Sequence, residues 1–270
     1  MPELPEVETV VQALRQPLIG RTITRVRNDW PRHVGTPGLD ALRARIQGCT
    51  VQAINRRAKY LVFSLTNGET LIAHLKMSGH LAVVDASQPA DKHVHTVFEL
   101  DNGRELRFRD IRKFGRVYLV QDQAEILGKL GPEPLEPTFT PQLLTERLNG
   151  RTRILKPLLL DQQFIAGVGN IYADESLFYA KLHPTRRADS LSKNEIVALH
   201  NAIQKVLKMG IEREGASIEL YVKPDGSKGD MQNAVAVFRR TGEPCYECGR
   251  PIERTVLGGR STHFCSNCQK

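Results

Sequence analysis

Residues 60–75 read Tyr60-Leu-Val-Phe-Ser-Leu65, then Thr66-Asn-Gly-Glu69, then Thr70-Leu-Ile-Ala-His-Leu75. The two outer runs are rich in strand-forming residues, and Asn67-Gly68 between them favours the tight turn of a β-hairpin. Asn102-Gly103 repeats this signal between Val97–Leu100 and Leu106–Phe108. The stretch from about residue 22 to 120 is therefore predicted to form an antiparallel β-sandwich or barrel.

Segments with helical spacing flank this β-rich region. Before it, apolar residues from Val7 to Leu14 predict one short helix over Glu6 to Gln16, which Pro17 to Gly20 ends. After it, helical spacing recurs in Leu155–Asp161, Ile171–Lys181 and Lys193–Gly210. The expected fold class is α+β, with an N-terminal antiparallel β-sandwich, flanking helices and a helical C-terminal part.

Prolines mark the expected domain boundary. The segment Gly131-Pro-Glu-Pro-Leu-Glu-Pro137 cannot form a continuous helix and favours an extended connector. We therefore expect a first domain over 1–130, a connector and the start of the helical region over 131–150, a helical domain over 151–235 and a separate tail over 236–270. Within the third range, Lys223–Asp230 is rich in Gly, Ser and Lys and is expected to be a mobile loop.

The composition favours a polyanionic partner. The 270 residues carry a formal charge of +8 and contain 40% hydrophobic residues, enough for real cores. Residues 1–20 have a net charge of −2, whereas residues 21–59 have +7. No run approaches the ~20 apolar residues that cross a bilayer, and the acidic N-terminus does not read as an export signal. We expect a soluble, cytoplasmic chain.

Four of the five cysteines lie in the tail, as Cys245-x2-Cys248 and Cys265-x2-Cys268. Two such knuckles are typical of one structural zinc ion held by four thiolates. The alternative is two disulfides or unligated thiols, which a non-exported chain favours less. Arg260 lies between the knuckles, either pressed against a phosphate or solvated at the surface. Cys49 stands apart and is interpreted as a buried apolar side chain.

The N-terminus offers a second kind of chemistry. Removal of Met1 would expose the secondary amine of Pro2, which can attack an electrophilic carbon as lysine does in Schiff-base chemistry. The pKa of an α-amino group is about 7.7–8.0, so a useful neutral fraction exists. Glu3 and Glu6 lie close by in the chain and are suited to proton transfer. The alternative is a simple helix start with favourable acids in its first turn.

The chain resembles the bacterial formamidopyrimidine-DNA glycosylases, which remove oxidised purines such as 8-oxoguanine from DNA. The resemblance runs end to end and rests on motifs in the family's order. They are Met1-Pro-Glu-Leu-Pro-Glu-Val-Glu-Thr9, Arg56-Arg-Ala-Lys-Tyr-Leu61, His74-Leu-Lys-Met-Ser-Gly79, Lys92-His93, Asp110-Ile-Arg-Lys-Phe-Gly115, Leu130-Gly-Pro-Glu-Pro-Leu135, Gly167-Val-Gly-Asn-Ile-Tyr-Ala-Asp-Glu175 and the four cysteines.

The resemblance implies a catalytic first domain, a helix–two-turn–helix DNA-binding domain and a zinc-finger hairpin. It implies that Pro2 attacks C1′ of the damaged nucleotide, that Glu3 relays protons and that Glu6 supports the site. Lys59 matches the lysine that assists strand cleavage, and Arg260 matches the arginine assigned to the later elimination. The implied activities are base removal and AP lyase β,δ-elimination, by a monomer that binds one structural zinc ion and oxidised duplex DNA.

The resemblance also implies residues that contact DNA. Three match the side chains that fill the hole left by the extruded nucleotide: Met77, Arg112 and Phe114. Without the resemblance, Met77 and Phe114 would be interpreted as core residues. Further residues match phosphate contacts: His93, Arg151 and Asn170, with His74 and Lys156 as weaker candidates. The Gly167-x-Gly169 turn lacks a dinucleotide-binding spacing and is interpreted as a tight turn that exposes N–H groups to phosphate.

Some positions depart from the family pattern. Lys113 and Arg151 exchange one cation for another, whereas Val94 and Phe238 each replace a polar side chain, and the loop 222–230 is variable.

Two rival functions remain at this point. An endonuclease VIII-type enzyme would act on oxidised pyrimidines, and Leu4 with the Met77, Arg112 and Phe114 set favours the purine enzyme instead. A non-catalytic zinc-ribbon protein would bind DNA without using Pro2.

Overall fold

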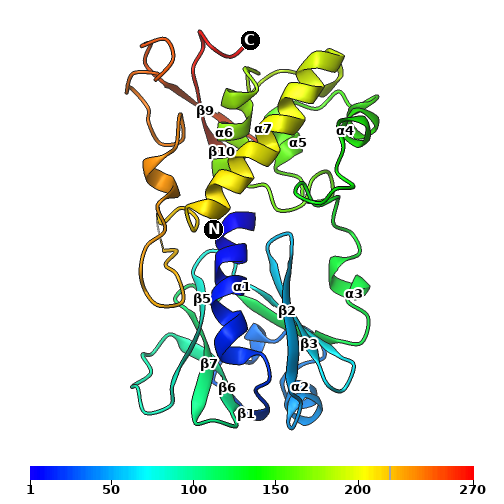
Figure 1. The fold of residues 1–270 in the computed structure, drawn as a ribbon, viewed down its shortest axis with the longest axis vertical. Coiled ribbons are helices and arrows are strands. Elements are labelled where there is room, and N and C mark those ends of the chain that lie inside the picture. The colour runs from blue at the N-terminus through cyan, green and yellow to red at the C-terminus, as the bar shows by residue number, and fades with distance from the viewer. Residues whose placement is uncertain (219) are drawn as a thin grey trace. The chain divides into compact units, whose positions relative to one another are not determined.

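The computed structural model describes residues 1–218 and 220–270, which divide into two compact units. The first unit contains Met1–Lys129 and Glu214–Asp230, and the second contains Leu130–Arg213 and Met231–Lys270 (Figure 1). The sequence placed 214–230 in the helical domain, but this segment packs with the first unit. No described helix is both long and apolar enough to cross a membrane.

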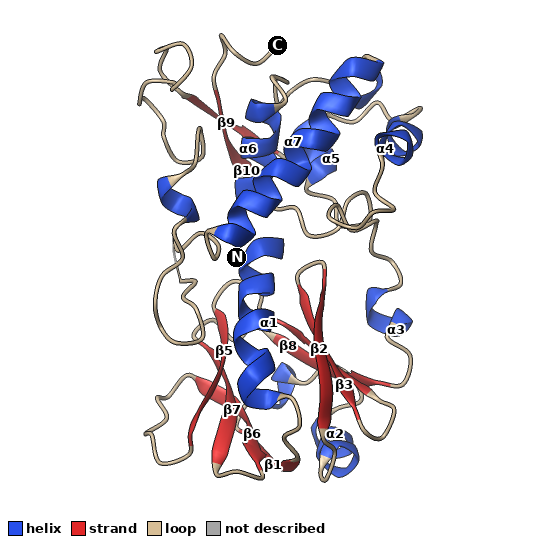
Figure 2. Ribbon diagram, in the orientation of Figure 1, coloured by secondary structure: helices blue, strands red, loops and turns tan. Residues whose placement is uncertain are grey.

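The first unit is built on two antiparallel sheets, whose strands are red in Figure 2. The strand order in one sheet is β1 (Ile23–Asn28), β6 (Val94–Leu100), β7 (Arg104–Asp110) and β5 (Gly79–Asp85). The order in the other is β2 (Val51–Arg57), β3 (Tyr60–Leu65), β4 (Thr70–His74) and β8 (Arg116–Val120). Both predicted hairpins are confirmed, β3 with β4 and β6 with β7. Gly68 and Gly103 turn them with φ of 80° and 74°.

Helix α1 (Leu4–Leu18) completes the core of this unit. Its apolar side, from Val7 to Leu18, is buried with residues of both sheets, and it contacts β2 of one sheet and β5 of the other. The helix is longer than predicted at both ends. Pro17, which was expected to end it, is accommodated in its last turn. Shorter helices are η1 (Pro31–His33), α2 (Leu39–Ile46) and α3 (Ala124–Leu127).

The second unit is helical and carries one hairpin. Its helices are α4 (Pro141–Leu148), α5 (Leu155–Leu159), α6 (Asn170–Tyr179), η2 (Ala188–Ser190), α7 (Lys193–Glu212) and η3 (Met231–Asn233). The hairpin pairs β9 (Glu253–Leu257) with β10 (Arg260–Phe264). Helix α6 packs on α7, where Gly210 lies against Tyr172: a Cβ there would be 2.5 Å from the ring. The α+β fold class and all three predicted C-terminal helices are confirmed.

Candidate functional site

The start of α1 brings Pro2, Glu3 and Glu6 together within one helical turn. Pro2 and Glu3 are buried, and the Glu3 N–H donates to Glu6 Oε2 at 2.8 Å. Glu3 in turn caps the helix with its own carboxylate, which completes a reciprocal capping box. The carboxylates of Glu3 and Glu6 are therefore held close to Pro2, the predicted nucleophile.

Glu6 also holds the segment that returns to this unit. Its second oxygen, Oε1, accepts the Ala216 N–H at 2.8 Å, and the Tyr221 hydroxyl lies 3.4 Å from the Glu6 carbonyl oxygen. Gly215 has φ of +81°, and a Cβ there would lie 2.7 Å from Glu6 Cγ. This anchoring was not predicted, because the residues involved are more than two hundred positions apart in the chain.

Lys59 occupies the tight turn between β2 and β3 and is 4% exposed. The turn is made by Ala58 with φ of 53°. Nearby, His74 ends β4 opposite Tyr60 and packs edge-on against that ring at 4.5 Å between centroids. Burial, with smaller effects from Lys76 and Lys59, lowers the pKa of His74 to about 3.

His74 is thus a neutral ring, and its Nδ1 accepts the Lys76 N–H at 2.9 Å. At 7% exposure it has little access to a ligand phosphate as a cation. Its predicted contact with DNA phosphate stays a prediction, which a neutral ring would make as a hydrogen-bond donor. Its hydrogen bond to the Lys76 backbone anchors the loop that precedes β5.

Met77 and the pair Arg112 and Phe114 lie on two loops of the first unit. Met77 is half-buried between β4 and β5, whereas Phe114 is 47% exposed between β7 and β8. The Arg112 guanidinium carbon lies 4.9 Å from the centre of the Phe114 ring, a stacked cation–π arrangement. Phe114 is therefore not a core residue, and an exposed aromatic with a stacked cation is suited to contact nucleobases.

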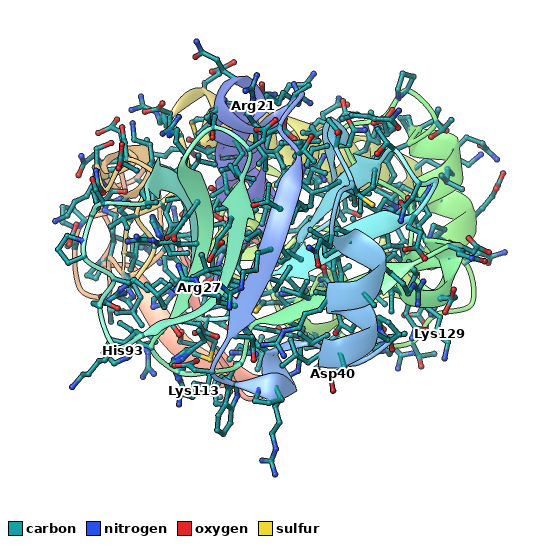
Figure 3. All side chains as sticks on the ribbon, turned by 90° about the horizontal axis from the view of Figure 1, so that it is seen from below. Arg21, Arg27, Asp40, His93, Lys113 and Lys129 are labelled. Carbon is teal, nitrogen blue, oxygen red and sulfur yellow. The ribbon has the colours of Figure 1, made fainter. Side chains whose placement is uncertain are left out.

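Two other side chains of the first unit, His93 and Lys113, are basic and lie near the surface. His93 is half-buried just before β6, and its N–H donates to Asp91 at 2.8 Å. Lys113, the departure from the family's arginine, places Nζ 4.3 Å from the centre of the Trp30 ring. Figure 3 labels His93 and Lys113 at the outer edge of its view. The Lys113 ammonium thus makes a cation–π contact with Trp30. This contact does not need the planar, bidentate guanidinium that an arginine would provide.

In the second unit the hairpin tip is held by one carbonyl. Arg260 is exposed and follows Gly258 and Gly259, whose φ angles of 55° and 73° make the turn. The carbonyl of the next residue, Ser261, accepts from Asn170 Nδ2 at 3.1 Å and from Lys156 Nζ at 2.6 Å. Asn170 is the first residue of α6, directly after the Gly167-x-Gly169 turn.

Lys156 does not face solvent. Its ammonium is fully buried and also lies 2.6 Å from the Asp174 carboxylate. In this structure the side chain supports the backbone beside Arg260, and its contact with DNA phosphate stays a prediction. Arg151, by contrast, is exposed, with its guanidinium 5.5 Å from the Phe164 ring. It keeps the accessibility that a phosphate contact requires.

Glu175 holds the backbone of the segment that contains Phe238, where the family commonly has a tyrosine. Its carboxylate accepts the N–H groups of Ala236, Val237 and Phe238 at 2.7, 2.9 and 2.9 Å. Burial raises the pKa of Glu175 to about 7, against the three N–H groups that favour its ionised form. Phe238 itself is buried, with its ring 5.1 Å from His263. Sequence reasoning missed Asp174 and Glu175 as supports, although both stand in a quoted motif.

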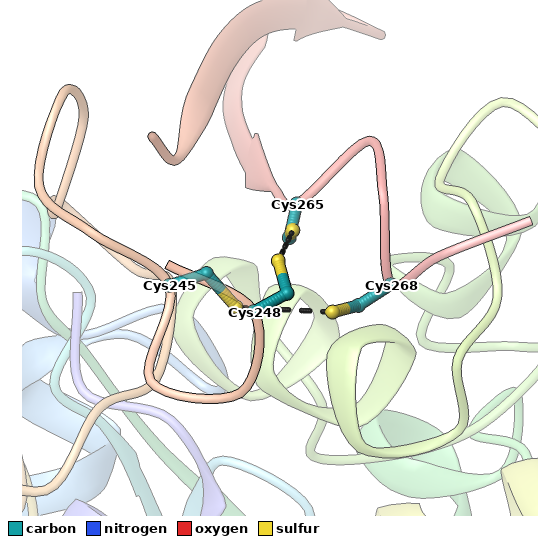
Figure 4. A group of neighbouring side chains, drawn as sticks. All are labelled: Cys245, Cys248, Cys265 and Cys268. Carbon is teal, nitrogen blue, oxygen red and sulfur yellow. Dashed lines mark hydrogen bonds between the residues drawn. The ribbon is translucent and has the colours of Figure 1, made fainter. Parts of the chain in front are cut away.

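The four tail cysteines converge on one point (Figure 4). All four Sγ atoms lie within 4.8 Å of one another, with Cys248 and Cys265 3.4 Å apart and Cys245 and Cys268 3.9 Å apart. Zn–S bonds of about 2.3 Å in a tetrahedron place sulfurs roughly 3.8 Å apart. None of the four forms a disulfide. The donor set therefore fits zinc, and the disulfide alternative is wrong.

Three sequence profiles match the chain almost from end to end. They are the formamidopyrimidine-DNA glycosylase N-terminal domain over 1–117, the H2TH domain of the same enzymes over 130–222 and a zinc finger found in FPG and IleRS over 242–270. The chain belongs to the formamidopyrimidine-DNA glycosylase family. A formamidopyrimidine-DNA glycosylase of Herpetosiphon aurantiacus is 50% identical over 272 residues and is matched over its full length, as is this chain.

Solved formamidopyrimidine-DNA glycosylases have the same fold. A Lactococcus lactis enzyme in complex with DNA containing Fapy-dG superposes with a TM-score of 0.93 at 38% identity, over all of both chains. The Thermus thermophilus enzyme superposes with a TM-score of 0.90 at 42% identity, over 99% of this chain and 98% of that one. Membership in this family makes the chain a DNA glycosylase with a zinc-binding finger. The rival hypothesis of a non-catalytic zinc-ribbon protein is thereby wrong.

Proposed function

We propose that this chain excises oxidised purines, including 8-oxoguanine and formamidopyrimidines, from duplex DNA and then cleaves the abasic strand. One observation carries the proposal: Pro2 is buried next to a reciprocal pair of carboxylates, Glu3 and Glu6, at the start of α1. Full-length similarity to enzymes crystallised with Fapy-dG and abasic DNA supports the same substrate class.

Pro2 supplies the nucleophile once Met1 is removed. Its neutral amine attacks C1′, and the glycosidic bond breaks as the base leaves with a proton. The C1′–O4′ bond then breaks, the amine proton is passed to O4′, and a charged iminium joins Pro2 to the opened sugar. Pro2 directly precedes α1, beside the carboxylates of Glu3 and Glu6.

The iminium makes the neighbouring sugar proton acidic, because the bond electrons left behind are drawn into the C=N⁺ group. Loss of that proton expels the 3′ phosphate, and a second elimination expels the 5′ phosphate. Glu3 is assigned the proton transfers at the opened sugar, and Lys59 and Arg260 the elimination steps. Glu6 is assigned to positioning, since its two carboxylate oxygens hold the Glu3 and Ala216 N–H groups.

The attack on C1′ requires a nucleotide outside the stack, at a cost of a few kcal/mol. Met77 is assigned to plug the hole, Arg112 to hydrogen-bond the orphaned cytosine and Phe114 to wedge the neighbouring step. Phosphate contacts are assigned to His93, Arg151 and Asn170. One zinc ion, held by Cys245, Cys248, Cys265 and Cys268, is assigned a structural role, because four thiolates leave no position for substrate. The chain is proposed to act as a monomer.

Borohydride trapping tests the nucleophile. Met1-processed protein is expected to form a covalent adduct with duplex DNA that carries 8-oxoguanine opposite cytosine. Pro2→Gly is expected to lose most of the adduct while still binding the duplex. Pro5→Gly is the matched control, because Pro5 lies three residues further along, in the first turn of α1, and has no proposed role in the reaction.

Three outcomes would count against the proposal. No adduct with processed wild-type protein would overturn the enzyme mechanism, and full trapping by Pro2→Gly would move the nucleophile to a lysine. Faster trapping with a thymine glycol duplex than with 8-oxoguanine would favour the endonuclease VIII-type specificity.

A further inference from the structure

A fully buried carboxylate, Asp110, lies at the base of the two loops that carry Met77, Arg112 and Phe114. Gly79 and Asp110 are direct partners at the ends of β5 and β7. The loop with Met77 therefore enters the sheet where the loop with Arg112 and Phe114 leaves it. This register brings the proposed plug and the proposed wedge to one edge of the same sheet.

Hydrogen bonds join the two loops through Ser78 and Asp110. The Ser78 hydroxyl donates to Asp110 Oδ1. The Arg112 N–H lies 2.9 Å from that hydroxyl oxygen and 3.2 Å from Asp110 Oδ1. Asp110 Oδ2 accepts the Gly115 N–H at 2.6 Å. Both carboxylate oxygens are thus used, and each holds the backbone of the loop with the wedge.

The backbone around Asp110 leaves little room for another arrangement. A Cβ on Gly115 would lie 2.6 Å from the Phe108 ring, 2.8 Å from His33 Nε2 and 3.0 Å from Asp110 Oδ2. Lys113 has φ of 58°, in the left-handed region that a lysine seldom adopts. The turn between Asp110 and Gly115 is therefore held in a sparsely populated conformation by the contacts to Asp110.

We propose that Ser78 and Asp110 are positioning residues that couple the two loops, so that Met77 and the pair Arg112 and Phe114 enter the DNA stack as one unit. The inference rests on the proposed function and adds two residues that are buried beneath the loops. Coupling matters because side chains that fill an emptied stack act only if they are ordered in advance. Loops that moved independently would each lose conformational entropy on insertion.

Ser78→Ala tests the coupling, because it removes one hydroxyl and leaves the backbone intact. Its matched control is Ser87→Ala: the Ser87 hydroxyl donates to Asp85 Oδ1 at 2.6 Å, at the opposite end of β5. Single-turnover rates are measured on a duplex with 8-oxoguanine opposite cytosine and on one with a preformed abasic site. An abasic nucleotide is easier to extrude, so its cleavage depends less on the plug and wedge.

The loss of one coupling hydrogen bond is expected to slow excision of 8-oxoguanine by roughly tenfold in Ser78→Ala. Cleavage of the abasic duplex is expected to change much less, and Ser87→Ala is expected to match wild type on both. Asp110→Asn should show the same selective loss with a larger effect. Equal losses on both duplexes, or none on either, would overturn the coupling.

Hydrogen exchange in the free protein gives a readout that needs no catalysis. The Arg112 and Gly115 amides are expected to exchange faster in Ser78→Ala than in wild type or Ser87→Ala, by a larger factor than amides elsewhere in the first unit. Unchanged exchange would overturn the proposal. Wild-type protein that excises no base would instead count against the proposed function, and the exchange result would still decide whether the loops are coupled.

Discussion

The Lys156 ammonium lies 2.6 Å from Asp174 Oδ1, and neither side chain is exposed to solvent. The other oxygen of Asp174 accepts the backbone N–H of His263 at 3.0 Å. Lys156 also donates to the Ser261 carbonyl, beside Arg260. This buried ion pair therefore links α5, α6 and β10, and it holds the zinc-finger hairpin on the helices of its own unit.

Lys156→Ala is expected to destabilise the protein by about 3–5 kcal/mol, because it leaves the Asp174 carboxylate buried without its cation. The control is Lys181→Ala, whose exposed partner Glu247 should make the change worth about 0–1 kcal/mol. Urea unfolding measures both. A loss below about 1 kcal/mol for Lys156→Ala would show that the carboxylate finds other compensation.

Cys248→Ser is expected to lose bound zinc and, with it, affinity for duplex DNA, since metal binding and folding of such fingers are linked. Zinc content by atomic emission and duplex binding by anisotropy measure the two effects. Cys49→Ser is the control, because Cys49 is buried in the first unit, away from the tetrad. Wild-type affinity in a zinc-free Cys248→Ser protein would show that the finger is dispensable for binding.

Glu6→Gln is expected to cost about 1–3 kcal/mol, because an amide has one acceptor oxygen for the two N–H groups that Glu6 now holds. The same change in the capping box of α7, Glu195→Gln, is the control, since that box lies at an exposed helix end. Denaturant unfolding and the rate of proteolysis within 214–230 are measured. Equal effects of the two substitutions would contradict a special role for Glu6.

His33 is expected to contribute to acid sensitivity. Burial lowers the pKa of this fully buried ring to about 4, from 6.5. The folded protein therefore binds this proton less readily than the unfolded chain. The associated stability is complete above pH 6.5 and declines as pH falls towards 4, by about 1.4 kcal/mol per unit and roughly 3 kcal/mol in all.

The pH effect is isolated by comparing wild type with His33→Asn in urea at pH 7 and pH 4. The variant has no titrating ring, so its stability deficit is expected to shrink by roughly 3 kcal/mol on acidification. Titrating groups remote from His33 act on both proteins and cancel in the difference. A deficit that stays constant between the two pH values would show that His33 is protonated as easily in the folded protein as in the unfolded chain.

Local patterns predicted much of the secondary structure. Asn67-Gly68 and the strand-forming runs around it specify a hairpin through neighbouring residues alone, and β3 and β4 formed within a residue of the predicted bounds. The predicted helix from Glu6 was less complete, because Pro17 was read as a stop and the structure keeps it in the last turn. Short-range rules locate elements better than their ends.

The sequence by itself determined the chemistry that this chain carries: a proline beside two carboxylates, and four cysteines whose spacing gathers four sulfurs around one metal position. These features are local, so spacing along the chain expresses them. Only the tertiary structure decided that 214–230 returns to Glu6, that Lys156 is buried on Asp174, and that Ser78 and Asp110 join two loops. Those contacts depend on which distant segments of the chain pack together. Packing also decides whether a charged side chain is exposed to solvent or is buried and hydrogen-bonded to the backbone.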